Sequence, residues 1–431
     1  MEKIKSLLLK MLPDSIKKEI LRPLCRQYKY YKYLKVYKQN QELSKKLKNK
    51  EKIRVAFLAI HSSVWKYDTL YRLMEKHPRF DPIIIVCPAV NFGYENMINV
   101  MNECYKRFCK GYNCIKAYDN KNNSYIDIRK DIEPDIIFYT NPYKGLIDDR
   151  YYINQYKDIL TCYVPYYWGE SALYDFSFNL EMQNLVWKLY SETKSHKKYS
   201  QQYAYNKGIN AIVSGYPGID NLINPQYQYK DVWKIKDRSI KRIIWAPHHT
   251  ISSSEIIHYS CFLNFYQDMI DFAKKYRNKI QIAFKPHPLL KVKLYNYWGK
   301  EKTDSYYKEW ETMPNSMLSE GDYIDLFLSS DGIIHDSGSF IAEYLYTRKP
   351  ALHTMTNPKT YEEFNEIGKQ CLDVYYHAKN KNEIEAFIIN LINGKDELFE
   401  SRNKFITTNL MPPNHKLASE NIFNDILVSI S

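Results

Sequence analysis

Ser337, Gly338 and Ser339 form the segment whose residue types are best suited to hold an anion. They follow an apolar run that ends at Asp336, and a helical pattern begins at Phe340. This order predicts a buried strand, a tight turn and a helix, so that two serine hydroxyls lie beside the free N–H groups of the first helical turn. A glycine between the serines lets a ligand come close to the backbone. We therefore expect a pyrophosphate to bind here.

Glu343 lies one turn into the same expected helix. A carboxylate at that position is placed to accept hydrogen bonds from the hydroxyls of a ribose. The segment is equally compatible with an ordinary helix start in which Ser337 or Ser339 is the N-cap. On the residues alone both interpretations remain open.

Two histidine-containing turns follow other apolar runs. Lys285 and His287 flank a proline directly after one run, and His248 and His249 follow a proline at the end of another. Because ligands bind at the carboxyl ends of parallel strands, His287 can donate to a phosphate oxygen there, and Lys285 adds positive charge. One of the other two histidines, His248 in our assignment, is expected to face the same crevice. A structural histidine in a rigid turn is the alternative. We predict no metal site, because no third ligand follows at a suitable spacing.

The elements that must position these residues are short apolar runs alternating with helical stretches. The expected strands are Arg54–Ile60, Pro82–Cys87, Asp135–Thr140, Leu160–Val164, Leu185–Tyr190 and Ala211–Ser214, then Ile243–Ala246, Ile280–Lys285, Gly332–His335 and Ala351–Met355. Runs buried on both faces and separated by helices are typical of doubly wound parallel sheets. We predict an α/β protein of GT-B architecture, in which two Rossmann-like domains face each other across a ligand cleft.

The predicted organisation has five parts. A basic helical arm covers residues 1–50, an acceptor domain 51–225, a polar linker 226–240, a nucleotide-donor domain 241–405 and a helical tail 406–431. Of these, only the two large domains carry the alternating strand and helix pattern that builds a sheet.

The positive charge of the chain is concentrated at its N-terminus. The formal net charge is +13, and residues 1–54 hold 17 Lys and Arg against 5 Asp and Glu. A basic, amphipathic arm on a nearly neutral body favours binding to an anionic membrane surface rather than a groove for nucleic acid. The alternative is an arm that packs on the body or on a second subunit. We predict short amphipathic helices in this arm and no nucleic-acid partner.

Several protein classes are excluded by what the sequence lacks. No apolar run approaches the roughly 18 residues of a membrane span. The first apolar run, at residues 7–9, is far shorter than a secretory signal requires. The chain has neither a Gly-rich dinucleotide fingerprint nor a phosphate-binding loop of the nucleotide kinases, and we expect no cofactor. Its cysteines show no paired spacing, so reduced thiols in the cytoplasm are expected.

These segments resemble, in content and order, the CDP-glycerol glycerophosphotransferases, a family of GT-B fold that builds teichoic acid and capsule polymers. The resemblance spans about residues 53–375. It is carried by Ser214-Gly215-Tyr216-Pro217-Gly218-Ile219-Asp220, by Ile243–Pro247, by His287-Pro288, and by the stretch from Ser330-Asp331 to Glu343. The resemblance implies that His287, Ser337 and Ser339 bind the donor's phosphates and that Asp336 shapes the loop. The same stretch is similar to the nucleotide-diphosphate signature of the UDP-N-acetylglucosamine epimerases.

One departure concerns the general base. The family carries Trp-His-Gly-Thr in its first domain, whereas this chain has Trp168 where the histidine would stand. We expect Glu170, which follows the turn, to be the base, with His61 at the end of the first strand as the second choice. His287 is expected to contribute to catalysis as well as to donor binding.

The resulting expectation is a transferase of cell-surface polymer synthesis. It would move a glycerophosphate-type polyol phosphate from a CDP-activated donor to the hydroxyl of a lipid-linked or polymeric acceptor. It would act in the cytoplasm, peripherally on the inner face of the cell membrane. Two alternatives stay open: a GT-B glycosyltransferase that uses a sugar nucleotide for capsule or lipopolysaccharide synthesis, and a non-catalytic membrane-associated scaffold.

Overall fold

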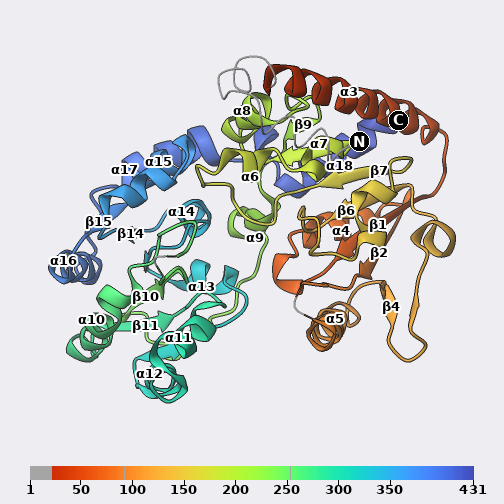
Figure 1. Cartoon of the computed structure of the whole chain (residues 1–431). Coiled ribbons are helices and arrows are strands. Elements are labelled where there is room, and N and C mark those ends of the chain that lie inside the picture. Colours follow the sequence, from red (N-terminus) through yellow and green to blue (C-terminus); the bar gives the residue numbers. More distant parts are fainter. Residues whose placement is uncertain (1–21, 92, 253) are drawn as a thin grey trace, which may run out of the picture. The chain divides into compact units, whose positions relative to one another are not determined.

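The computed structural model describes residues 22–91, 93–252 and 254–431. They form two compact units (Figure 1). The first unit comprises the chain up to Tyr166, Tyr174–Ser214 and Glu420–Ser431, and the second comprises Tyr167–Leu173 and Gly215–Ser419. The short segment Tyr167–Leu173 therefore belongs to the second unit, although its place in the sequence is within the first.

The first unit is built on a seven-stranded sheet in the order β3-β2-β1-β6-β7-β8-β9. All its strand pairs are parallel. The strands are β1 Ile53–Ala59, β2 Phe80–Val86, β3 Cys114–Lys116, β6 Ile136–Tyr139, β7 Leu160–Tyr163, β8 Lys188–Ser191 and β9 Ala211–Val213, with a hairpin of β4 Tyr118–Asp119 and β5 Ser124–Tyr125 beside them. The long central strands β1 and β2 are almost wholly buried, as their uninterrupted apolar sequences predict.

Helices cover both faces of this sheet. They are α3 Arg22–Lys46, α4 Asp68–Lys76, α5 Tyr94–Phe108, α6 Tyr174–Phe178, α7 Glu181–Leu185, α8 Lys194–Tyr203 and α18 Ala418–Ser429. In α4 the buried side chains Leu70, Tyr71 and Met74 share one face, the spacing of an amphipathic helix. The C-terminal helix α18 joins the same core through Ile422 and Ile426. The last segment of the chain thus completes the unit with which the chain begins.

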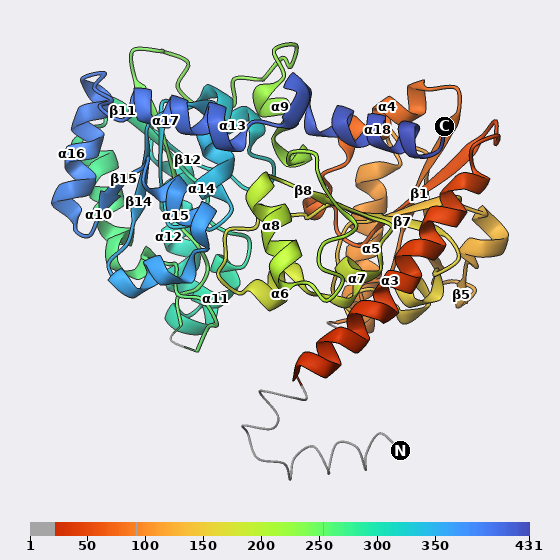
Figure 2. The same cartoon turned by 90° about the horizontal axis from the view of Figure 1, so that it is seen from above.

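The basic arm differs from its prediction where the structure describes it. Residues 1–21 lie outside the described residues, but from Arg22 the chain forms one continuous helix of 25 residues rather than several short ones. This helix, α3, runs along the first unit (Figure 2). Tyr33 and Asn40 on its inner side are buried, and Arg26 donates to the backbone oxygens of Gln202 and Tyr203. The long helix is stabilised by this packing, which the local spacing of apolar residues does not reveal.

The second unit is built on a six-stranded sheet in the order β12-β11-β10-β13-β14-β15, again with every pair parallel. The strands are β10 Lys241–Ala246, β11 Ile280–Phe284, β12 Ser316–Leu318, β13 Gly332–His335, β14 Ala351–Thr354 and β15 Tyr376–Ala378. The helices are α9 Asp220–Ile223, α10 Phe262–Lys275, α11 Leu290–Trp298, α12 Lys300–Thr312, α13 Ile324–Ser329, α14 Phe340–Glu343, α15 Glu366–Leu372, α16 Lys381–Ile392 and α17 Phe399–Phe405. Two parallel sheets confirm the doubly wound α/β prediction.

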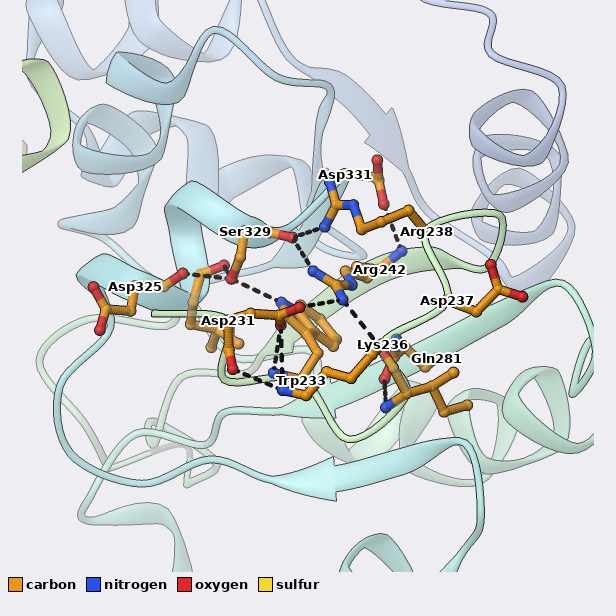
Figure 3. Close-up of polar contacts among 12 residues, drawn as sticks. Asp231, Trp233, Lys236, Asp237, Arg238, Arg242, Gln281, Asp325, Ser329 and Asp331 are labelled. Atoms are coloured by element: carbon orange, nitrogen blue, oxygen red, sulfur yellow. Dashed lines mark hydrogen bonds and ion pairs between the residues drawn. The ribbon is translucent and has the colours of Figure 1, made fainter. Parts of the chain in front are cut away.

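The polar segment 226–240, for which the sequence predicts a linker, is held on the second unit by hydrogen bonds and an ion pair to the buried residues Arg242 and Ser329 (Figure 3). Arg242 is 1% exposed and pairs with Asp231 at 2.8 Å. The indole of Trp233 donates to Ser329, and Arg238 donates to the Ser329 backbone oxygen. A buried guanidinium needs such partners.

Within the described ranges, no helix is both long enough and apolar enough to cross a membrane.

Candidate functional site

Three loops of the second unit meet at the carboxyl ends of adjacent parallel strands. Strand β10 lies between β11 and β13, with Trp245 opposite Phe284 and Ala246 opposite His335. The strands therefore end level with one another. The loops that follow carry His248, His287 and Asp336, which the sequence assigned to the donor site from three separate motifs. This edge of a parallel sheet is where ligands of open α/β folds bind.

Asp336 links two of these loops. Its Oδ1 accepts from the backbone N–H of His248, and its Oδ2 accepts from the backbone N–H of Cys261, each at 2.5 Å. Burial raises the pKa of the Asp336 carboxyl to about 7, although these backbone donors act in the opposite direction. The contacts agree with the predicted role of Asp336 in shaping the loop.

The helix that begins after the loop of residues 337–339 is short. The helix that follows, α14, has only four residues and continues as a 3-10 turn over Tyr344–Thr347. So short a helix has little dipole, and the expected contribution of a full helix N-terminus is correspondingly small. Ser339 occupies the N-cap position, but in the described structure its side chain makes no capping bond. Ser337 and Ser339 are both half-buried.

Glu170 lies against this loop. A Cβ atom placed on Gly338 would clash with Glu170 Oε1 and lie 2.9 Å from its Cδ and 3.0 Å from Tyr259 Cε2. Glu170 is itself 6% exposed. Burial and the nearby Glu170 raise the pKa of the Tyr259 hydroxyl, so this phenol stays protonated. The structure thus brings the predicted base next to the predicted phosphate loop.

The segment that carries Glu170 is fixed on the second unit by Asn365. The Asn365 backbone N–H donates to the Glu170 backbone oxygen at 2.8 Å, and its side-chain amide donates to the Gly169 backbone oxygen at 2.7 Å. Asn365 also caps helix α15 by accepting from the N–H of Gly368. Trp168, at the position of the family's histidine, is fully buried. Its indole therefore helps to anchor the segment and does not face solvent.

Glu343 and Lys285 are engaged within the protein. Glu343 is 2% exposed and accepts a hydrogen bond from Tyr323. Lys285 donates through Nζ to the Gly321 backbone oxygen at 2.8 Å, and burial lowers its pKa to about 8. Both side chains lie in the second unit, as predicted. An ammonium has three N–H donors and a carboxylate two acceptor oxygens, so these contacts alone do not prevent either group from also meeting a ligand.

The histidines form a cluster that the sequence did not predict. One ring nitrogen from each of His248, His249 and His287 lies within 4.8 Å of the other two. The backbone N–H of His287 donates to the backbone oxygen of Pro247, which joins the two turns. The sequence offered no third ligand for the adjacent pair, because the approach of His287 comes from the pairing of β10 with β11. Lys293, on α11, donates to His249 Nδ1 at 2.9 Å and pairs with Glu255.

His61 and Asp220, which the sequence also singled out, lie outside the cluster of site residues described above. His61 follows β1 in the first unit, and burial lowers the pKa of its imidazole. Asp220, the last residue of the Gly-Tyr-Pro segment, accepts from the backbone N–H groups of Ala418 and Ser419 at 2.8 and 3.0 Å. It thereby caps the start of α18, which is a structural role.

Comparison with known proteins gives one family. The family model described as CDP-glycerol:poly(glycerophosphate) glycerophosphotransferase matches residues 172–427, more than half of the chain. This range contains every residue of the candidate site in the second unit except Glu170, which precedes it by two positions. No curated protein matches the chain significantly.

Solved structures show the same fold. The wall teichoic acid polymerase TagF is 14% identical with a TM-score of 0.59, over 94% of this chain and 98% of that one. MnaA of S. aureus, solved with UDP, is 15% identical with a TM-score of 0.54, over 88% and 98%. The UDP-GlcNAc 2-epimerase of Neisseria meningitidis, bound to UDP-GlcNAc, is 14% identical with a TM-score of 0.53, over 88% and 99%. The GT-B-like fold is thereby confirmed.

Proposed function

The chain belongs to the CDP-glycerol:poly(glycerophosphate) glycerophosphotransferase family, and from this membership we propose how its second unit takes part in the transfer. It is a glycerophosphotransferase-family enzyme, and the family implies CDP-glycerol as the donor. In such a transfer the acceptor oxygen forms a bond to the phosphorus that carries glycerol. The bond from that phosphorus to the bridging oxygen breaks, CMP leaves, and a base takes the proton of the acceptor hydroxyl.

The donor's diphosphate is proposed to bind at the carboxyl ends of β10, β11 and β13. Ser337 and Ser339 offer hydroxyls, Gly338 leaves room for a close approach, and His287 offers an imidazole N–H. Support comes from Asp336, which ties the serine loop to the backbone of His248. Preorganised donors of this kind stabilise charge that develops on a leaving phosphate without reorganising during the reaction. Lys285 is proposed to contact the phosphates, and Glu343 the hydroxyls of the ribose.

Glu170 is proposed as the general base. The observation that carries this assignment is its contact with Gly338, between the two serines. A base must lie within hydrogen-bond reach of the hydroxyl it deprotonates, and the reacting phosphorus must lie near the phosphate loop. A carboxylate against that loop is near the expected position of the phosphorus, where an acceptor hydroxyl that attacks it would also come. His61 remains the second choice for the base.

The acceptor is proposed to be the hydroxyl end of a lipid-linked or polymeric substrate of cell-surface synthesis. Support comes from the family and from the relative named as a wall teichoic acid polymerase. Such a substrate is anchored at a membrane, which requires the enzyme to work close to that surface.

The exposed side of α3 is proposed as the part of the described chain that meets an anionic membrane. Leu24, Tyr28 and Tyr31 are at least 59% exposed and recur at helical spacing, and Lys35 and Lys38 continue the same stripe. Exposed aromatic and apolar side chains bordered by lysine are what an interfacial helix presents to anionic lipid. The enzyme would then lie on the inner face of the cell membrane.

A donor-binding experiment tests this proposal. Calorimetry with the full chain is expected to give measurable affinity for CDP-glycerol and weaker or no binding of CDP-ribitol, UDP-sugars and GDP-sugars. Ser339→Ala is expected to weaken CDP-glycerol binding by about 1–3 kcal/mol, the cost of leaving a phosphate oxygen poorly paired. Preferential binding of a sugar nucleotide would instead favour a glycosyltransferase. The absence of any donor binding at millimolar concentration would favour a scaffold.

A further inference from the structure

The hydrogen bonds around the three clustered histidines determine which ring nitrogen carries the proton. His287 Nδ1 accepts from the backbone N–H of Leu289 at 3.1 Å, and a backbone N–H can only donate. His249 Nδ1 faces the ammonium of Lys293, which also has donors only. Both Nδ1 atoms are therefore acceptors. In a neutral imidazole the single proton then resides on Nε2.

Thr250 fixes the same proton position for His248. The His248 Nδ1 lies 2.9 Å from Thr250 Oγ1. That oxygen already accepts from the backbone N–H groups of Tyr259 and Ser260, at 3.2 and 3.3 Å. With both lone pairs in use, the hydroxyl hydrogen of Thr250 points to His248 Nδ1. His248 Nε2 therefore carries the proton, as in the other two rings.

Three imidazoles of this tautomer are suited to an anion and unsuited to a metal ion. A metal ligand must offer a lone pair, and the second nitrogen of a ligating histidine normally donates to a carbonyl or carboxylate. Here the second nitrogens accept, so each Nε2 presents an N–H. Burial and the neighbouring charges lower the pKa of His249 to about 4 and that of His287 to about 3, and that of His248 well below its usual range. The rings are thus uncharged donors at neutral pH.

We infer that the Nε2–H groups of His248, His249 and His287 together donate hydrogen bonds to the diphosphate of the nucleotide donor. We also infer that Lys293 is the positioning residue for His249. The inference rests on the proposed function and deepens it, because it adds His249 and Lys293 to the donor site and assigns that site to oxyanions. The Lys293–Glu255 ion pair holds the ammonium against Nδ1. The hydrogen bond from the His248 backbone N–H to Asp336 connects the three histidines to the serine loop.

The test uses glutamine and leucine at the same positions. Glutamine places a side-chain N–H near the position of Nε2 but is a poor metal ligand, whereas leucine removes the donor. Calorimetry of the full chain in EDTA, with inorganic pyrophosphate, CDP and CDP-glycerol as separate probes, is expected to show His249→Leu binding each about 10- to 100-fold more weakly, the range for hydrogen bonds to charged groups. His249→Gln is expected to stay within about threefold of the parent. His415→Gln, an exposed histidine elsewhere in the same unit, is the matched control.

Lys293 is tested by rescue. Lys293→Met is expected to weaken pyrophosphate binding severalfold, because His249 can then place its proton on Nδ1, and Lys293→Arg is expected to restore most of the affinity. Thermal unfolding of each variant separates lost binding from lost folding, and the lysine pair gives an answer even where a histidine variant fails to fold.

The outcomes separate this inference from the proposed function. Loss of pyrophosphate binding in EDTA, or stoichiometric Zn²⁺ binding that His249→Gln abolishes, would overturn the anion assignment in favour of a metal. CDP-glycerol binding that is equal in parent and His249→Leu would remove His249 from the site while leaving the transferase intact. If pyrophosphate binding depends on His249 but CDP-glycerol does not bind, the inference stands and the choice of donor is refuted.

Discussion

Gly338 and Glu170 lie in direct contact, so closely that no side chain fits between them: a Cβ atom on Gly338 would clash with Glu170 Oε1 and lie 2.9 Å from its Cδ. A residue in the phosphate loop and a carboxylate 168 positions earlier in the sequence therefore share one surface. Glycine is required here for space, since the backbone of Gly338 does not adopt a left-handed conformation.

Gly338→Ala is expected to push the Glu170 carboxylate away from the loop and to lower turnover by at least about tenfold, with a loss of about 1–3 kcal/mol of unfolding free energy from overpacking. Steady-state kinetics and urea unfolding measure the two effects. Gly111→Ala is the control, because a Cβ there would meet only Arg72 Nη2 at 3.4 Å, an ordinary contact. Equal and full activity of both variants would mean that Glu170 can move without consequence.

Glu170→Gln is expected to reduce turnover by about 10²–10⁴-fold, the range for loss of a general base. Donor affinity is expected to change by less than about threefold, because the amide keeps the shape of the carboxyl and the donor's phosphates bind to other groups. His61→Asn, which removes the second-choice base, is the paired variant. A large loss in His61→Asn together with normal turnover in Glu170→Gln would exchange the two assignments.

The sheets were predictable because their central strands are buried on both faces and read as apolar runs. Predicted and observed bounds differ by one residue for β1, Arg54–Ile60 against Ile53–Ala59. The short strands β3, β12 and β15 were missed, since each has three residues and is partly exposed. Their pairing comes from the neighbouring strand and leaves little trace in the local sequence.

The site was partly predictable for a similar reason. Motifs at strand ends predicted that Asp336 and His287 lie at one edge of the sheet, because the strand order of a parallel sheet gathers its carboxyl ends. The role of His249 could not be read from the sequence, since it depends on Lys293 and on the pairing of β10 with β11. The contact of Glu170 with Gly338 likewise depends on Asn365, which binds the segment Tyr167–Leu173 to the second unit.

A pH-dependent contribution to stability is expected from His353 in strand β14. Its ring is fully buried, and among the described residues no group hydrogen-bonds either of its nitrogens. Burial and the neighbouring His335 and His377 lower its pKa well below the usual value. Below about pH 6.5 the imidazole therefore binds a proton in the unfolded chain but stays unprotonated in the folded chain. Stability is consequently lost as the pH falls. At pH 5 one such ring costs about 2 kcal/mol.

His353→Leu should remove this dependence. At pH 7 the variant is expected to be as stable as the parent or more so, because it no longer buries unpaired polar atoms. Between pH 7 and pH 5 it should lose about 2 kcal/mol less than the parent. Comparing the two proteins cancels the other buried groups, including Asp336, whose raised pKa acts in the opposite direction. Urea unfolding at both pH values provides the measurement, and parallel losses in parent and variant would contradict the assignment.

The membrane proposal is best tested without removing α3. Deleting the arm would expose the surface on which Tyr33 and Asn40 pack, and would confuse lost binding with lost folding. Changing the exposed Lys32, Lys35 and Lys38 to glutamate is expected to weaken partition to phosphatidylserine vesicles at low salt, since each lysine near such a surface contributes up to about 1 kcal/mol. The melting temperature should remain unchanged.

The same triple change at Lys379, Lys381 and Lys395, exposed lysines of the second unit, is the charge-matched control. At low salt, vesicle sedimentation is expected to show weaker binding by the α3 variant than by the control variant. The two are expected to bind equally as the Debye length falls below about 8 Å. Equal binding by both would show that overall charge, and not α3, governs the association.

The identity of the released nucleotide tests the central claim most directly. Transfer of glycerophosphate breaks the bond between the two phosphates and releases CMP, whereas a glycosyltransferase breaks a carbon–oxygen bond and releases a nucleoside diphosphate. Incubation of the full chain with CDP-glycerol and a lipid-linked acceptor, followed by chromatography of the nucleotides, is predicted to yield one CMP for each glycerophosphate incorporated, and almost none with Glu170→Gln. Release of CDP, or of CMP without incorporation, would contradict the account.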